Sequence, residues 1–183
     1  MPRIRLFVVE LVSFALIALI GCQNNVAESP ETAVAPAAHS VVENARLANF
    51  DDLDFNVFAG QKWDELKKSH AANIVVHWPD GHTTTGIEKH IEDLKALFTW
   101  APDTRVTAHP IKTADGDYTA VTGVYEGTFT QPMTLPDGTV IQPTGKPFKL
   151  DMCTVGHWKG DTMDEEYLFW DNQTFMKQVG LAK

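Results

Sequence analysis

The sequence is poor in cysteine: among its 183 residues only Cys22 and Cys153 carry a thiol. Small domains that depend on disulfides carry several pairs, so a disulfide scaffold is excluded. The sequence also lacks an uninterrupted apolar run of the ~20 residues that a bilayer span needs. The longest such stretch lies near the N-terminus, where Glu10 interrupts it.

Basic residues are also scarce, because 15 Lys and Arg face 24 Asp and Glu, for a formal net charge of −9. Such a chain repels phosphate backbones, so we expect no nucleic-acid partner. The chain is 44% hydrophobic, with a length that suits one ordinary domain with a real core.

Several catalytic signatures are missing. We find no H-E-x-x-H, C-x-x-C or two-His-one-carboxylate spacing, although His77, His82 and His90 lie near one another in the sequence. No G-x-S-x-G and no glycine-rich phosphate loop occurs either. The sequence therefore predicts no metal site, no serine triad and no nucleotide site.

What the N-terminus does contain is an export pattern. Two arginines in "MPRIR" precede the apolar run, and "LIGC" ends at Cys22. This order is typical of a signal peptide, and "LIGC" resembles the bacterial lipobox, in which cleavage precedes an acylated cysteine. We expect a signal peptide over residues 1–21, a lipid on Cys22, a flexible tether over residues 22–40 and a membrane-anchored lipoprotein of the cell envelope. An uncleaved N-terminal anchor is the alternative.

The remaining chain, residues 41–183, shows helical spacing first and then a period of two. Apolar residues and turn signals predict helices over 41–60, 61–71, 86–100 and 172–181, and strands over 73–78, 104–113, 117–130, 146–158 and 161–171. Residues 131–145, rich in proline and glycine, are predicted to form a long loop with a small hairpin. This order indicates an α+β fold, in which N-terminal helices pack on a curved, cone-shaped antiparallel sheet. Gly123 and Gly127 are places where such a sheet could bend.

The last strand mixes acids and aromatics on one face. By alternation, Glu165, Tyr167, Phe169 and Asp171 share that face. A partly apolar, partly wet cavity would suit all four, and a carboxyl group there would have a raised pKa. Asp171 could instead be the N-cap of the closing helix, accepting from the amide of Thr174 or its neighbour.

Three patches resemble the SnoaL-like polyketide cyclases of the nuclear transport factor 2-like superfamily. They are "HWPDG" followed by Gly86, the pair "GVYEGTF" and "PTGKPF", and "DEEYLFWDNQTFMKQVGL". The resemblance covers about residues 45–181 and implies a cone-shaped cavity and catalysis without metal or cofactor. Two features depart from the family: Tyr125 replaces a histidine, and the loop before "PTGK" is longer than usual.

The resemblance implies that Asp171 shuttles a proton during an aldol closure. His77 could orient a carbonyl or carboxylate at the cavity mouth, or be a strand-end histidine without a role. Tyr125 could hydrogen-bond an enolate oxygen, or simply fill the cone. The expected ligand contacts are Glu165, Tyr167, Phe169, Phe129 and Trp78.

Three functions fit these expectations. The first is a cyclase, isomerase or lyase that acts on a small carbonyl compound by proton transfer. The second is a module that binds a small apolar ligand without turnover, and the third is an interaction domain that forms a homodimer through the sheet face. The fold alone does not choose among them.

Overall fold

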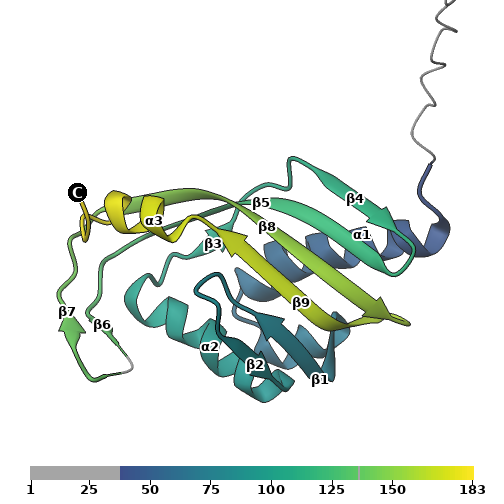
Figure 1. The fold of residues 1–183 in the computed structure, drawn as a ribbon, viewed down its shortest axis with the longest axis horizontal. Helices are drawn as coiled ribbons and strands as arrows, with labels where there is room; N and C mark the ends of the chain where they lie inside the picture. The colour runs from purple at the N-terminus through teal and green to yellow at the C-terminus, as the bar shows by residue number, and fades with distance from the viewer. Residues whose placement is uncertain (1–37, 136) are drawn as a thin grey trace, which may run out of the picture. The chain divides into compact units, whose positions relative to one another are not determined.

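Three long antiparallel strands, β5 (Tyr118–Thr128), β8 (Pro147–Lys159) and β9 (Thr162–Trp170), form the centre of a curved sheet (Figure 1). The computed structural model describes residues 38–135 and 137–183. On β5 and along most of β8, buried residues alternate with more exposed ones, as expected for strands with one face on a core. The sequence period of two thus sets the centre of the fold.

The shorter strands extend this sheet on both sides, in the order β2-β1-β9-β8-β5-β3, with β4 also paired to β5. β1 runs parallel to β9, whereas the other pairs are antiparallel. Their bounds are β1 His70–His77, β2 Thr83–Thr85, β3 Arg105–Val106 and β4 Lys112–Asp115. A separate hairpin pairs β6 (Met133–Thr134) with β7 (Val140–Ile141) inside the predicted loop.

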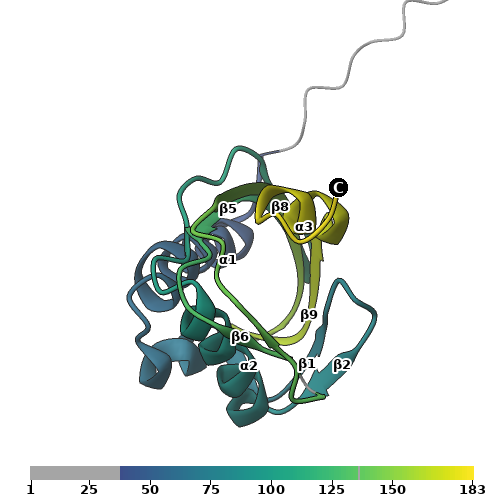
Figure 2. The same cartoon turned by 90° about the vertical axis from the view of Figure 1, so that its left-hand side faces the viewer.

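Helices cover one face of the curved sheet (Figure 2). A capping box at Ser40 starts α1 (Val41–Asp52), which continues as a π-helix, η1 (Leu53–Phe58). A 3₁₀ helix, η2 (Trp63–Lys68), precedes β1, and α2 (Ile87–Trp100) follows β2. The short helix α3 (Asn172–Gln178) closes the chain against β8.

Arg46 ties α1 to both long hairpins. Its buried guanidinium donates to the carbonyl oxygens of Gly116 and Gly160, at 2.7 and 3.2 Å, and pairs with Asp117. Gly116 and Gly160 both lie in the turns, with φ of 56° and 69°, a region that glycine adopts without strain. One side chain therefore fixes the helix layer relative to two turns.

The predicted α+β class with a curved sheet and helices is confirmed, as are the two hairpin turns and the small hairpin in the long loop. The second helix is shorter than predicted. It ends at Lys68 and is followed by Ser69, whose amide and hydroxyl donate to the Leu66 carbonyl, so that His70 begins β1 instead.

The predicted signal peptide, Cys22 and all but the last three residues of the tether lie outside the described residues. Within the described part of the chain, no helix has the length and apolar character needed to cross a bilayer.

Substitution of two phenylalanines can test which face of the sheet packs against the core. Phe129 is fully buried, whereas Phe169 is 52% exposed. We expect Phe129→Ala to lower the free energy of unfolding by about 3–5 kcal/mol, because it leaves a cavity. Phe169→Ala should change it by no more than about 0.5 kcal/mol. Urea denaturation of both variants checks this, and equal losses would contradict the assigned faces.

Candidate functional site

A cavity of about 50 Å³ lies between the helices and the sheet. Its wall is mostly apolar and includes Phe58, Leu94 and Leu168. The polar groups that line it are few: Asp54, His70, His90, Tyr125, Thr154 and Glu166. Ligand sites in proteins are typically apolar cavities with a few convergent polar groups, and this cavity has that composition on a much smaller scale.

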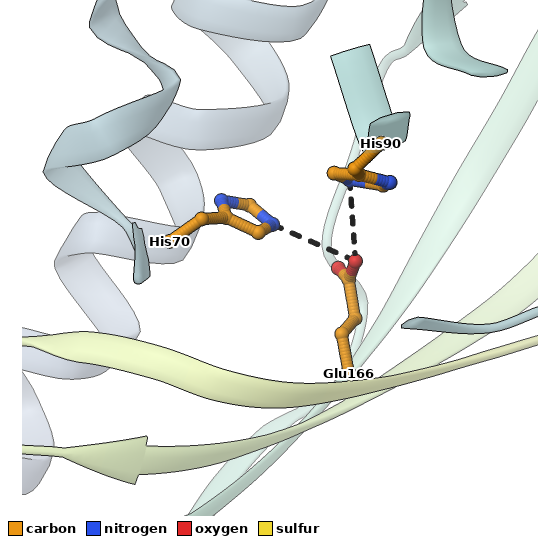
Figure 3. A group of neighbouring side chains, drawn as sticks. All are labelled: His70, His90 and Glu166. Carbon is orange, nitrogen blue, oxygen red and sulfur yellow. Dashed lines mark ion pairs between the residues drawn. The ribbon is translucent and has the colours of Figure 1, made fainter. Parts of the chain in front are cut away.

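Three of these groups converge on one point (Figure 3). Glu166 projects from β9, His70 begins β1, and His90 lies in the first turns of α2. The Glu166 Oε2 lies 3.5 Å from the Nε2 of His70 and 3.5 Å from the Nε2 of His90. All three side chains are almost completely buried.

The electrostatics of this cluster favour a charged carboxylate. Burial alone would raise the pKa of Glu166, but the neighbouring imidazoles of His70 and His90 outweigh it, so that the pKa is lowered overall. Burial lowers the pKa of His90 to about 4. At neutral pH the cluster therefore contains an ionised Glu166 beside a neutral His90.

Asp54 reaches the same cavity from the π-helix η1. Single-turn π segments are rare and frequently occur at functional sites. The Asp54 Oδ2 lies 2.8 Å from the Nε2 of His109, whose Nδ1 lies 2.8 Å from Asp51. His109 thus holds the Asp54 carboxyl group in place from the side.

The pKa values of Asp54 and His109 are both raised. Burial raises the pKa of Asp54, against the hydrogen bond and the charge of His109. Burial would lower the pKa of His109, but its hydrogen bonds to Asp54 and Asp51 raise it overall. Asp54 therefore holds a proton more readily than an ordinary aspartate does.

Tyr125 lines the cavity, as both of its predicted roles require. Its hydroxyl is buried and has no hydrogen-bond partner among the described residues. The neighbouring Thr104 hydroxyl donates to the Ala101 carbonyl at 2.7 Å. Burial raises the pKa of Tyr125, so the phenol stays protonated and can donate to a bound oxygen.

The face predicted for the last strand is wrong. Glu165, Tyr167 and Phe169 lie on the outer face of the sheet, and Glu166, Leu168 and Trp170 point inward. A β-bulge is the reason: the register between β8 and β9 shifts by one residue between Trp158↔Met163 and His157↔Glu165. A slip of one residue exchanges the two faces of a strand.

His77 belongs to this outer face as well. Its Nε2 lies 2.8 Å from Glu165, and its ring stacks on Tyr167 with centroids 4.3 Å apart. The structure therefore brings His77, Glu165 and Tyr167 together, but on the far side of the sheet from the cavity.

Asp171 is an N-cap. Its Oδ1 accepts from the amides of Gln173 and Thr174, at 2.8 and 3.1 Å, and its Oδ2 accepts from the Thr174 hydroxyl. These hydrogen bonds lower the pKa of Asp171, first the one from the Thr174 side chain and then those from the backbone. The predicted raised pKa is therefore wrong, because this carboxyl group is exposed and bonded.

Of the two remaining predicted ligand contacts, Trp78 lies in the cavity wall and Phe129 does not. Trp78 lines the cavity, and its Nε1 donates to Thr84 at 3.1 Å. Phe129 packs edge-on against Trp100 in the core and lies outside the cavity lining. The predicted homodimer through the sheet face stays a prediction.

Sequence reasoning missed Asp54, His70, His90 and Glu166. A search for metal-binding or catalytic spacing examines neighbours in the sequence, whereas these four residues come from four separate elements. One signal was available: "DEE" offers two adjacent glutamates, and only one of them can face inward.

Comparison with known proteins identifies the same family that the sequence patches resemble. The sequence model of the SnoaL-like polyketide cyclases matches residues 50–179. No curated protein sequence matches the chain.

Solved structures match the fold at low sequence identity. A candidate SnoaL-like polyketide cyclase from Jannaschia sp. CCS1 is 19% identical, with a TM-score of 0.69 over 80% of this chain and 99% of its own. IdmH, a candidate polyketide cyclase from Streptomyces antibioticus, is 20% identical, with a TM-score of 0.62 over 77% and 99%. A ketosteroid isomerase-like protein from Catenulispora acidiphila, in complex with trimethylamine, is 19% identical, with a TM-score of 0.58 over 79% and 95%.

The cap at Asp171 makes a testable stability prediction. Asp171→Ala should lower the midpoint of thermal unfolding at pH 7, and Asp171→Asn should lower it less, because asparagine retains an accepting oxygen. A lowered pKa means that the ionised cap stabilises the fold above the unfolded pKa, and that this is lost as pH falls through the folded pKa. The gap between wild type and Asp171→Ala should therefore close in acid, as melting curves at pH 7 and pH 3 can check.

Proposed function

Because the chain belongs to the SnoaL-like polyketide cyclase family, we propose that it catalyses cyclase- or isomerase-type proton transfer on a small carbonyl compound in this cavity. One observation carries the proposal. A partly buried carboxyl group, Asp54, lines the cavity with a raised pKa and is positioned by His109.

Asp54 suits this role better than the other carboxyl groups. A general acid–base is most effective when its pKa lies near the working pH. The pKa of Asp54 is raised, whereas the pKa values of Glu166 and Asp171 are lowered. Asp171 also uses both carboxylate oxygens in its cap.

Asp54 and Tyr125 together can perform an enolisation. The ionised Asp54 takes a proton from the carbon next to the carbonyl, and electrons of the C–H bond move toward the carbonyl oxygen. The Tyr125 hydroxyl donates a hydrogen bond to the oxygen that becomes negative. Protonated Asp54 then returns the proton to the same or another carbon, which completes an exchange or an isomerisation.

The cavity volume limits the substrate. Because one water needs about 10–15 Å³ on this measure, a volume of about 50 Å³ admits only a few non-hydrogen atoms. We therefore favour a small ketone, aldehyde or keto ester over a fused-ring polyketide. The mostly apolar wall also supports a second function, in which a small ligand binds without turnover.

Proton exchange in D₂O tests the reaction without knowledge of the natural substrate. We expect wild-type protein to accelerate deuterium uptake at the α-carbon of acetone or butanone, followed by proton NMR. Asp54→Asn should lower the protein-dependent rate by about 10²–10⁴-fold, since it removes the base. Tyr125→Phe should lower it less, because it removes one hydrogen bond.

The matched control is Glu165→Gln, which changes a carboxylate on the outer face. It should leave the rate unchanged. A wild-type rate equal to that of buffer, or an Asp54→Asn rate equal to that of wild type, contradicts the proposed reaction. Saturable ligand shifts in NMR without exchange would favour the binding function.

We also propose that the chain is an exported lipoprotein anchored through Cys22, because the arginines of "MPRIR", the apolar run and "LIGC" follow one another in the order of an export signal. Expression in a bacterium with a labelled fatty acid should label the wild-type chain and Cys153→Ser. Cys22→Ser should remain unlabelled and keep its N-terminal segment, as mass spectrometry would show. Label on Cys22→Ser would contradict the lipobox assignment.

A further inference from the structure

We propose that His70, His90 and Glu166 form a binding site for one divalent first-row transition metal ion, such as zinc. The ligand atoms are the Nε2 of each imidazole and the Oε2 of the carboxylate. This inference goes beyond the proposed proton transfer and does not rest on it. Two imidazoles and one carboxylate are a donor set used by zinc and by ferrous iron in proteins.

The distances within the cluster suit a metal better than a hydrogen bond. N–H···O bonds have lengths of about 2.7–3.2 Å, and both N–O distances here are 3.5 Å. Ligands bound at about 2.1 Å around a tetrahedral ion lie roughly 3.4 Å apart. All three ligand atoms lie within 4.8 Å of one another, so one ion can reach them together.

Unpartnered atoms at the centre of the cluster support the same conclusion. The Nε2 of His70 and the Oε2 of Glu166 are buried and lack a hydrogen-bond partner among the described residues. A buried polar atom without a partner costs about 1–3 kcal/mol. Two such atoms that face each other would both be satisfied by one cation.

The contacts of Ser69 orient the His70 ring for this role. The Ser69 hydroxyl has one proton, and the Leu66 carbonyl, 3.1 Å away, can only accept it. The Ser69 oxygen lies 2.8 Å from the His70 Nδ1 and can then accept the Nδ1 proton. With Nδ1 held by the Ser69 hydroxyl group, the Nε2 of His70 is directed at the centre of the cluster and can bind a metal ion there, as outer hydrogen bonds arrange for metal-bound histidines.

The cluster also leaves room for a further ligand. It lies on the wall of the cavity, so a water or a ligand oxygen can complete the coordination from that side. Three protein ligands with one open position are the arrangement of catalytic rather than structural zinc. His90 lacks an outer partner at Nδ1, so we expect it to be the weaker of the two imidazole ligands.

Cobalt titration of the full chain tests the site directly. After treatment with a chelator, wild-type protein should bind one equivalent of Co²⁺ with the visible absorption of a four- or five-coordinate ion, and Zn²⁺ should displace it. Glu166→Gln, His70→Asn and His90→Asn should each weaken binding at least about tenfold. His77→Asn and Glu165→Gln provide matched controls, because they change the same residue types on the outer face and should bind as wild type does.

Wild-type measurements keep the test decisive if a buried variant fails to fold. X-ray absorption of the zinc-loaded wild type should report two imidazole ligands and oxygen, and zinc should raise the melting temperature. Absence of binding, fewer than two imidazoles, or loss of binding in the outer-face controls would overturn the site. Asp54→Asn should still bind Co²⁺, so failure of the metal site and failure of the proposed proton transfer are distinguishable.

Discussion

The β-bulge at the start of β9 decides which side chains the cavity contains. Without it, the pairing of Trp158 with Met163 would continue and place Glu165, Tyr167 and Phe169 inside. The inserted residue, Asp164, is held by His157, whose Nδ1 lies 2.6 Å from its carboxylate. An extra residue on one strand re-aims every side chain that follows it. The burial of Glu166, and with it the chemistry of the cavity, depends on this local irregularity.

Burial of Glu166 in the cavity has a free-energy cost that the surrounding groups must offset. An ionised carboxylate in an apolar interior is unfavourable unless other groups compensate for its charge. Here the nearest groups are His70 and His90, whose Nε2 atoms lie 3.5 Å from the Glu166 Oε2, beyond ordinary hydrogen-bond length, so the compensation is incomplete. Apart from these two imidazoles, the neighbourhood is mainly apolar. A bound cation would therefore compensate the negative charge of Glu166 more completely than the two imidazoles do.

The elements of the fold follow from sequence period and turn chemistry, and they were predictable. "ADG" and "KGD" mark the two long hairpins, and the spacing of Leu94 and Phe98 marks α2. The inward face of β9 was not predictable by alternation, because alternation assumes an unbroken register. The resemblance to the family implied a catalytic role for Asp171. The sequence itself also predicted an N-cap at this position, and the structure has the contacts of an N-cap. Tyr125 could be placed because β5 pairs with β8 without a shift.

Two carboxyl groups line one cavity, and their surroundings shift their pKa values in opposite directions. Burial dominates at Asp54 and raises its pKa, whereas the two imidazoles dominate at Glu166 and lower its pKa. Environments that separate two acids in this way assign them different roles. A group that holds its proton more readily suits proton transfer, and one that stays ionised suits binding of a cation. The proposed acid–base chemistry and the proposed metal site are therefore compatible within one cavity, because each uses the carboxyl group that the other does not.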